Sequence, residues 1–229
     1  MEKRPSSGIW PDSHWESLFR QATSLLAESC RDAYWTFGGG TALALRYAHR
    51  ISYDVDIFLR DVQAVGYLTP RINDIAASIA TSYDESAHGV KIVTERGDID
   101  FVVAADVTDL DPDTMIVQGQ ETRVQVPAEI LAKKIQYRGY QFAHRDIFDL
   151  AMLMDKDAQE VNIAVSFCGP DAIEKTARAI AAHLRSLNAT LPDYVNPTPG
   201  FASFIGRVTD IVIDFPRVRD FASGPRNRR

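Results

Sequence analysis

The sequence predicts an α/β protein whose second half is mostly helical. Three observations support this prediction. Apolar residues make up 45% of the 229 positions, enough for a substantial core. Strand-like and helical runs alternate as far as about residue 125, and from Pro127 onward almost all the periodicity is helical. We therefore expect two domains, residues 1–125 and residues 126–229, with a boundary defined only to within several residues.

The first domain is expected to begin with a helix over residues 13–34, with Ser13 as its N-cap. A short strand at 35–37 runs into three glycines, and residues 41–49 resume a helical pattern. Residues 53–59 alternate as a strand. The remaining predicted elements are a helix begun by Thr69-Pro70 and extending to residue 83, strands at 90–95 and 99–106, and a hairpin at 114–127.

The second domain is expected to contain helices over 127–140, 145–154 and 171–187, followed by a loop over 188–200. Residues 207–215 suit a helix or a strand, and the pattern does not decide between them. No apolar run is long enough to span a membrane, the N-terminus lacks the apolar stretch of a secretion signal, and two cysteines imply no disulfide framework. These features predict a cytoplasmic protein with reduced thiols and no membrane partner.

Gly38, Gly39 and Gly40 stand between the expected strand at 35–37 and the helix that follows. Glycine permits positive φ and close approach to a ligand, and successive amides there can form a nest for an anion. The helix, expected to start near Thr41, would add the positive end of its dipole. Because strand-to-helix turns often use glycine only to turn, phosphate binding at this turn is a hypothesis.

Asp54 and Asp56 flank Val55, so in a strand both carboxylates point to one face. Two adjacent carboxylates repel unless protons or a cation neutralise them, and Mg²⁺ is typically held by one or two carboxylates plus substrate phosphates. Two solvated aspartates on an edge strand are the alternative interpretation. A third carboxylate would come from Asp98 or Asp100, and we favour Asp100 because it lies inside its strand.

Gly39-Gly40, Asp54-Val55-Asp56 and Ile99-Asp100-Phe101 together resemble the signature of the DNA polymerase β-like nucleotidyltransferases. Within that superfamily the segments 39–45 and 49–58 resemble the AbiEii/AbiGii toxin family of bacterial toxin–antitoxin and phage-defence systems. The family's helical lysine and R-D-x-x-D motif are matched in 131–138 and 145–149, so the resemblance covers roughly residues 35–155. It implies a mixed sheet flanked by helices, followed by a mostly helical half.

The resemblance also implies roles for particular residues. Asp54, Asp56 and Asp100 would bind Mg²⁺ or Mn²⁺ and carry the chemistry, with Lys134 and Asp146 as further catalytic residues. The expected contacts to the phosphates of a nucleoside triphosphate are Gly39, Gly40, Thr41, Arg50, Lys134 and Arg138. Lys133 competes with Lys134 for the position of the family's lysine. A solvated basic face and an ordinary i,i+4 ion pair are the structural alternatives for the lysine helix and the R-D-x-x-D motif.

The function implied by the resemblance is transfer of a nucleoside monophosphate from a triphosphate to a hydroxyl of RNA, notably transfer RNA, or of protein. A cognate antitoxin would be a partner. The net charge of −6 excludes nucleic-acid binding over the whole surface, although 131–145 and 216–229 are locally basic, and Arg226, Arg228 and Arg229 are candidates for an RNA contact. The alternatives are nucleotidyl transfer to a small molecule such as an antibiotic, and a non-catalytic nucleotide-binding protein.

Overall fold

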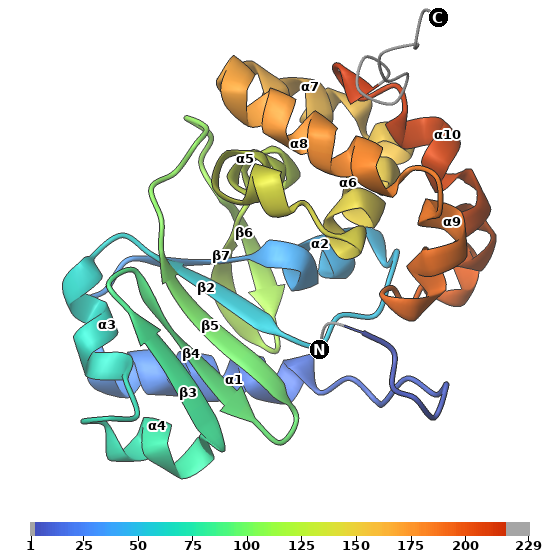
Figure 1. The fold of residues 1–229 in the computed structure, drawn as a ribbon. Helices are drawn as coiled ribbons and strands as arrows, with labels where there is room; N and C mark the ends of the chain where they lie inside the picture. The colour runs from blue at the N-terminus through green and yellow to red at the C-terminus, as the bar shows by residue number, and fades with distance from the viewer. Residues whose placement is uncertain (1–2, 219–229) are drawn as a thin grey trace, which may run out of the picture. The chain divides into compact units, whose positions relative to one another are not determined.

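The computed structural model describes residues 3–218, which form two compact units (Figure 1). The first unit contains Pro11–Ala105 and Leu110–Val126. The second contains the other described residues, most of them from Pro127 onward. The predicted site at Arg226, Arg228 and Arg229 lies outside the described residues.

The first unit is built on a seven-stranded sheet with the order β3-β4-β5-β2-β1-β7-β6. Its strands are β1 (Trp35–Gly38), β2 (Val55–Leu59), β3 (Ser82–Ser86), β4 (Gly89–Thr94), β5 (Gly97–Val103), β6 (Asp113–Val117) and β7 (Gln120–Val124). Strand β2 pairs in parallel with β5, and β1 in parallel with β7, whereas the other neighbours are antiparallel. The sheet is therefore mixed, and the predicted fold class is confirmed.

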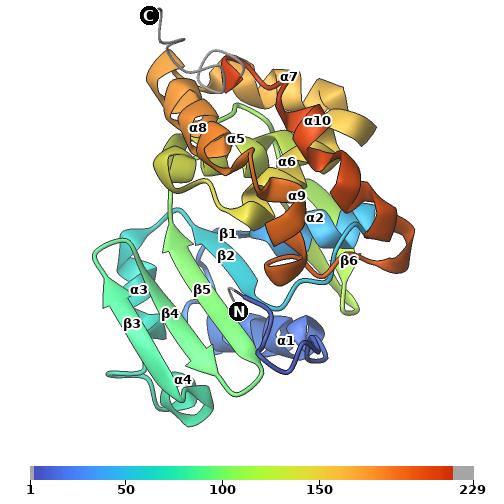
Figure 2. The ribbon, with the colours of Figure 1, turned by 45° about the vertical axis from the view of Figure 1, so that its right-hand side comes forward.

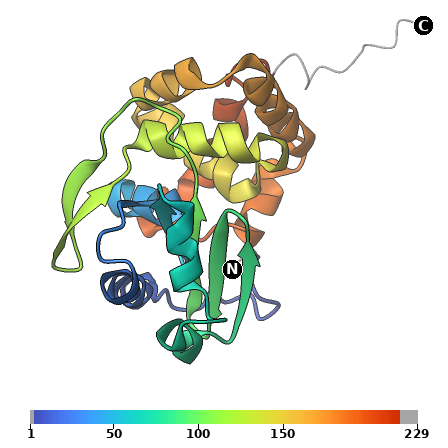
Figure 3. The same ribbon diagram turned by 90° about the vertical axis from the view of Figure 1, so that its left-hand side faces the viewer.

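The two faces of the sheet differ in chemistry. Val55, Ile57 and Leu59 of β2 are fully or almost fully buried, and they alternate with Asp56 and Phe58, which are only partly buried. Helices α1 (Trp15–Ser29) and α3 (Val62–Leu68) pack against strands on one face of the sheet (Figures 1 and 3). The period of two thus puts the apolar side chains in the core and the aspartates on the opposite face.

The helices of the first unit begin and end at places that differ from the sequence predictions. Helix α1 has His14 as its N-cap residue, because the hydroxyl of Ser13 instead donates to the carbonyl of Ser52. Helix α2 (Gly39–Tyr47) begins at the glycines and not near Thr41. Helix α3 was not predicted, and α4 (Asp74–Ile79) begins after Asn73 and not at Thr69-Pro70.

The second unit is helical, as predicted from Pro127 onward (Figure 2). Its elements are α5 (Pro127–Arg138), η1 (Gly139–Gln141), α6 (His144–Lys156), α7 (Ala158–Phe167), α8 (Pro170–His183), α9 (Leu187–Thr190), η2 (Leu191–Asp193), η3 (Pro199–Arg207) and α10 (Val208–Val212). Helix α7 was not predicted, and the expected loop at 188–200 contains short helical turns. The undecided segment 207–215 is helical at α10.

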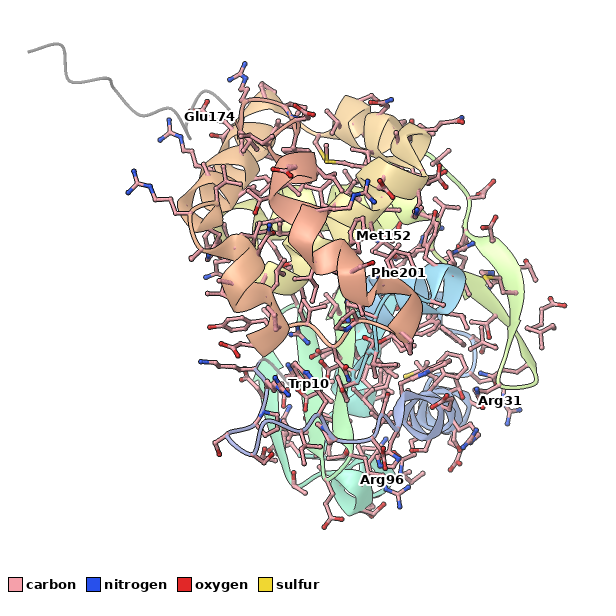
Figure 4. The ribbon with its side chains drawn as sticks, turned by 90° about the vertical axis from the view of Figure 1, so that its right-hand side faces the viewer. Trp10, Arg31, Arg96, Met152, Glu174 and Phe201 are labelled. Carbon is pink, nitrogen blue, oxygen red and sulfur yellow. The ribbon has the colours of Figure 1, made fainter. Side chains whose placement is uncertain are left out.

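Aromatic side chains help to pack these helices together. Phe148 of α6 meets Phe204 of η3 edge-on, with ring centroids 5.6 Å apart, and Phe201 approaches Phe204 at the same distance. Met152 and Phe201 mark this region in Figure 4. Helix α5 contacts α7 and α8, and α6 contacts α7 and α10. Among the described residues, no helix is both long and apolar enough to cross a membrane.

Candidate active site

The register of the sheet places four residues in one row across neighbouring strands: Gly38, Asp56, Asp100 and Lys91. Asp56 of β2 lies opposite Gly38 of β1 on one side and opposite Asp100 of β5 on the other. Asp100 in turn lies opposite Lys91 of β4. Residues directly opposite one another on neighbouring strands share a face of the sheet. Two carboxylates predicted to act together are therefore direct neighbours, with a glycine turn on one side and an ammonium on the other.

The glycine turn lies directly against the Asp56 carboxylate. Gly39 has φ of +66°, in the left-handed region, and a Cβ on this residue would collide with the carboxylate of Asp56. A Cβ on Gly40 would collide with the guanidinium of Arg50. The two glycines therefore allow the start of α2, with its unpaired first-turn amides, to lie beside a carboxylate and a cation.

Thr41 and Arg50, both expected at the phosphates, contact the segment that leads into β2. The hydroxyl of Thr41 is 2.8 Å from the Ser52 hydroxyl and also bonds to the carbonyl of Asp54. Nη1 of Arg50 donates to the same Ser52 hydroxyl at 3.2 Å, and both Thr41 and Arg50 are buried. The side chain of Thr41 thus fixes the backbone at Asp54 to helix α2.

The carboxylates are electrostatically strained. Burial, together with the charge of Asp56, raises the pKa of Asp100 to about 7, although Lys91 opposes the shift. Asp54 has a different environment, because its Oδ1 accepts the backbone N–H of Asp98 at 3.3 Å. Of the two candidates for the third carboxylate, Asp100 is the one in register with Asp56, while Asp98 lies two residues earlier in β5.

The fit of these residues to a divalent cation can be judged from their geometry. Across residues 3–218, no three Asp, Glu, His or Cys side chains are grouped closely enough to hold a metal ion. Asp56 and Asp100, however, provide adjacent oxygen donors whose mutual repulsion a hard cation would relieve. Mg²⁺ commonly needs only one or two carboxylates when the phosphates of a substrate supply further oxygens. The pair therefore fits a cation that arrives with a nucleotide.

Lys91 was missed by the sequence analysis. Its Nζ lies 3.1 Å from Oδ2 of Asp98 and 3.5 Å from Oδ2 of Asp100. Burial would lower the pKa of Lys91, but Asp100, Asp98 and Asp54 together raise it, so the ammonium stays charged. The only signal in the sequence is one charged residue in the apolar run 90–93, and its partners become apparent only from the register of β4 and β5.

In the second unit, Lys134 is buried between two carboxylates of the R-D-x-x-D motif. Its Nζ lies 2.7 Å from Oδ1 of Asp146 and 2.6 Å from Oδ2 of Asp149. Arg138, which is about half exposed, approaches Oδ2 of Asp146 at 3.4 Å. Burial would raise the pKa of Asp146, but Lys134 and Arg138 outweigh burial and hold it below its usual value. Asp146 and Asp149 therefore hold the Lys134 ammonium in one place.

The neighbouring Lys133 has other partners. Its Nζ lies 3.0 Å from Asp106 and 3.0 Å from Glu129. The Glu129 carboxylate also accepts the backbone N–H groups of Val107 and Thr108. Lys133 thus belongs to a buried cluster that fixes the segment 106–109 to α5 within the second unit, whereas Lys134 contacts the second acidic motif. The sequence analysis did not identify Glu129 or Asp106.

Comparison with known families identifies the class of the protein. A family model described as nucleotidyl transferase AbiEii toxin, type IV toxin–antitoxin system, matches residues 24–221. The protein is thus a nucleotidyltransferase, as its glycine turn and aspartate motif predicted. The chain belongs to the AbiEii toxin family, which confirms the resemblance inferred from the motifs. Membership implies a nucleoside triphosphate substrate and an antitoxin partner.

The solved structures to which the chain is similar are distant from it in sequence. The antibiotic-resistance factor ANT(2″)-Ia is 16% identical, with a TM-score of 0.47, over 67% of this chain and 90% of that one. MenT4, a nucleotidyltransferase toxin from Mycobacterium tuberculosis, is 13% identical, with a TM-score of 0.46, over 90% of this chain and 86% of that one. JHP933 from Helicobacter pylori is 13% identical, with a TM-score of 0.43, over 93% and 96% of the two chains. No functional conclusion follows from similarities this weak. No curated protein sequence matches the chain.

Proposed function

We propose that this nucleotidyltransferase transfers a nucleoside monophosphate from a triphosphate to a hydroxyl of RNA, with transfer RNA as the preferred acceptor, and that Mg²⁺ or Mn²⁺ is required. The observation that carries this proposal is the direct pairing of Asp56 with Asp100 beside the Gly39 turn, in a chain of the AbiEii family. The first unit is then the nucleotidyltransferase core. The protein acts as a toxin in the cytoplasm, and its antitoxin neutralises it there.

The proposed reaction is a single displacement at phosphorus. The oxygen of the acceptor hydroxyl attacks the α-phosphorus, the bond from that phosphorus to the bridging oxygen breaks, and pyrophosphate leaves. The hydroxyl proton passes to solvent or to Asp100. The amides of Gly39, Gly40 and Thr41 bind the outer phosphates at the start of α2, and Arg50 adds positive charge beside Gly40. Asp56 and Asp100, with Asp54, would hold the cation, which supplies charge that offsets the developing negative charge.

In the second unit, we propose that Lys134, Arg138 and Asp146 are also needed for transfer. Arg138, which is about half exposed, can bind phosphate charge, whereas Lys134 is buried between Asp146 and Asp149 and orders the acidic motif beside Arg138. Asp146 acts through Lys134, because its carboxylate fixes the ammonium at 2.7 Å. Replacing Asp146 by Asn should therefore lower the transfer rate less than replacing Lys134 by Met, since the amide can still accept a hydrogen bond from the ammonium.

The test is incubation with each α-³²P-labelled triphosphate, Mg²⁺, total RNA and total protein, followed by separation of the two fractions. We expect label in RNA with the wild-type protein, none with EDTA, and a loss of roughly a thousandfold or more in Asp56→Asn. Glu121→Gln is the matched control, because Glu121 is exposed on strand β7 of the same sheet and should retain transfer within about twofold.

Each possible result bears on the proposal. Label found only in the protein fraction would show that the acceptor is a protein and not RNA. If an antibiotic is labelled and neither macromolecular fraction is, the small-molecule alternative is correct. Undiminished transfer by Asp56→Asn would refute the assignment of the metal-binding carboxylates. Nucleotide binding without any turnover would show that the protein binds nucleotide but does not catalyse transfer.

A further inference from the structure

The ammonium of Lys91 lies against the carboxylate of Asp100, to which the proposed function assigns a divalent cation. The β4–β5 register sets its Cα opposite that of Asp100, and its ammonium contacts both Asp98 and Asp100. The shorter distance, 3.1 Å, is to Asp98, which accordingly anchors the ammonium. The Lys91 side chain is 42% exposed, so water and a competing cation can reach it. The cluster therefore carries a cation of its own beside the carboxylate pair.

We propose that Lys91 is a positioning residue that acts as a resident counter-ion: it holds Asp100 beside Asp56 in the metal-free protein and competes with the divalent cation for Asp100. This inference rests on the proposed function only in that the cation is the one assigned above to Asp56 and Asp100. Nucleotide bound to the glycine turn would provide further oxygen ligands for the cation. The cation would then compete more effectively with Lys91 for Asp100. Divalent metal alone would then bind weakly, and metal with nucleotide would bind well.

The proposal predicts two effects of opposite sign when the ammonium is removed. Without Lys91, the repulsion between Asp56 and Asp100 is no longer compensated, so the metal-free protein becomes less stable. The same removal eliminates a positive charge that lies 3.5 Å from Oδ2 of Asp100, so a divalent cation would bind that carboxylate more tightly. An ordinary surface ion pair produces neither effect, because such pairs contribute little to stability and do not touch the metal position.

The experiment compares wild-type protein with Lys91→Met, with Lys91→Arg and with Arg71→Met. Arg71 is the matched control because it forms an exposed ion pair, 3.0 Å long, with Glu85 of the neighbouring strand β3. Free Mn²⁺ is measured by electron paramagnetic resonance without nucleotide, and Tm is measured in EDTA. We expect Lys91→Met to bind Mn²⁺ about tenfold more tightly than wild type and to melt several degrees lower in EDTA. Lys91→Arg and Arg71→Met should bind Mn²⁺ within threefold of wild type.

Unchanged or weaker Mn²⁺ binding by Lys91→Met would overturn the proposal, as would an unchanged Tm in EDTA. Absence of Mn²⁺ binding by both wild type and Lys91→Met would overturn both this inference and the metal assignment. The two can also fail separately. If Lys91→Met shows both expected effects but no acceptor is labelled, the proposed role of Lys91 is supported and the proposed transfer reaction is refuted.

Discussion

At the scale of single residues, Gly39 is a site where one methyl group should abolish activity. Its φ of +66° costs an L-residue roughly 1–2 kcal/mol, and a Cβ would displace the Asp56 carboxylate. We expect Gly39→Ala to lower the free energy of unfolding by at least that amount and to reduce transfer at least a hundredfold. Gly66→Ala, in helix α3 with no atom within 4 Å of the added methyl, should be neutral or stabilise by up to about 1 kcal/mol. Urea unfolding measures the stability of each variant, and a labelled-nucleotide assay measures its transfer rate. Equal stability and equal transfer in the two variants would contradict the close contact between Gly39 and the Asp56 carboxylate.

Asp100 makes stability depend on pH in a defined direction. Because its pKa is raised to about 7 in the folded protein, Asp100 binds more protons there than in the unfolded chain between about pH 4 and pH 7. The free energy of unfolding should therefore decrease as pH rises through this window in EDTA. Asp100→Asn should remove that contribution, so its stability changes less between pH 5 and pH 7.5. Urea unfolding at the two pH values tests this, and identical changes in both proteins would refute the electrostatic strain.

The residues of the carboxylate row differ in how far the sequence could predict them. Alternation within a strand is readable from sequence, so Asp54 and Asp56 could be assigned to one face. The resemblance assigned Asp100 to the same metal site, but the parallel pairing of β2 with β5 that places it beside Asp56 cannot be predicted from periodicity. The contact of Lys91 depends on the β4–β5 register, which is set by the turn at 95–96 and by packing of the core. Arg96 marks this turn in Figure 4.

At the scale of elements, Glu129 of α5 anchors the segment 106–109 of the second unit. It is 3% exposed, accepts N–H groups from Val107 and Thr108 and pairs with Lys133. Glu129→Ala leaves the buried ammonium with one carboxylate fewer and two amides without an acceptor, so we expect a loss of about 3 kcal/mol. Lys175→Ala removes an exposed i,i+4 partner of Asp171 and should change stability by less than about 0.5 kcal/mol. Chemical unfolding checks both, and a loss below 1 kcal/mol for Glu129→Ala would contradict the anchoring role.

Element boundaries were predicted least well between residues 62 and 86. The side chain of Thr69 was expected to cap a helix, but its hydroxyl donates to Glu85 at 2.7 Å. Asn73 provides the cap instead, because its Oδ1 accepts the N–H groups of Ile75 and Ala76. Strand β3 is exposed at every position, so it has no apolar alternation from which a strand could be predicted. Its pairing with β4 is a tertiary effect that local sequence does not encode.

At the scale of the whole molecule, most of the buried positive charge is already neutralised by the protein itself. The chain has 25 Lys and Arg against 31 Asp and Glu. Lys133 and Lys134 are buried in ion pairs, and Arg46 pairs with Asp113 at 2.8 Å while donating to two backbone carbonyls. These paired cations are not available to an extended polyanion, and the net charge of −6 also opposes one. We therefore expect any recognition of RNA to depend on a small number of phosphates.

This charge balance leads to a prediction about salt. Each phosphate that a protein cation neutralises contributes about −0.9 to the slope of log K against log salt, so three neutralised phosphates give a slope of about −2.7. We expect affinity for an RNA acceptor to fall by no more than about 40-fold between 50 and 200 mM salt, whereas a protein that neutralises six or more phosphates would bind about a thousandfold or more weakly at the higher salt. Fluorescence anisotropy with labelled transfer RNA, at fixed Mg²⁺ and with the catalytically impaired Asp56→Asn variant, measures the slope without turnover. A slope steeper than about −5 would require an extended basic track that this acidic chain does not suggest, and a slope near zero would favour a protein acceptor.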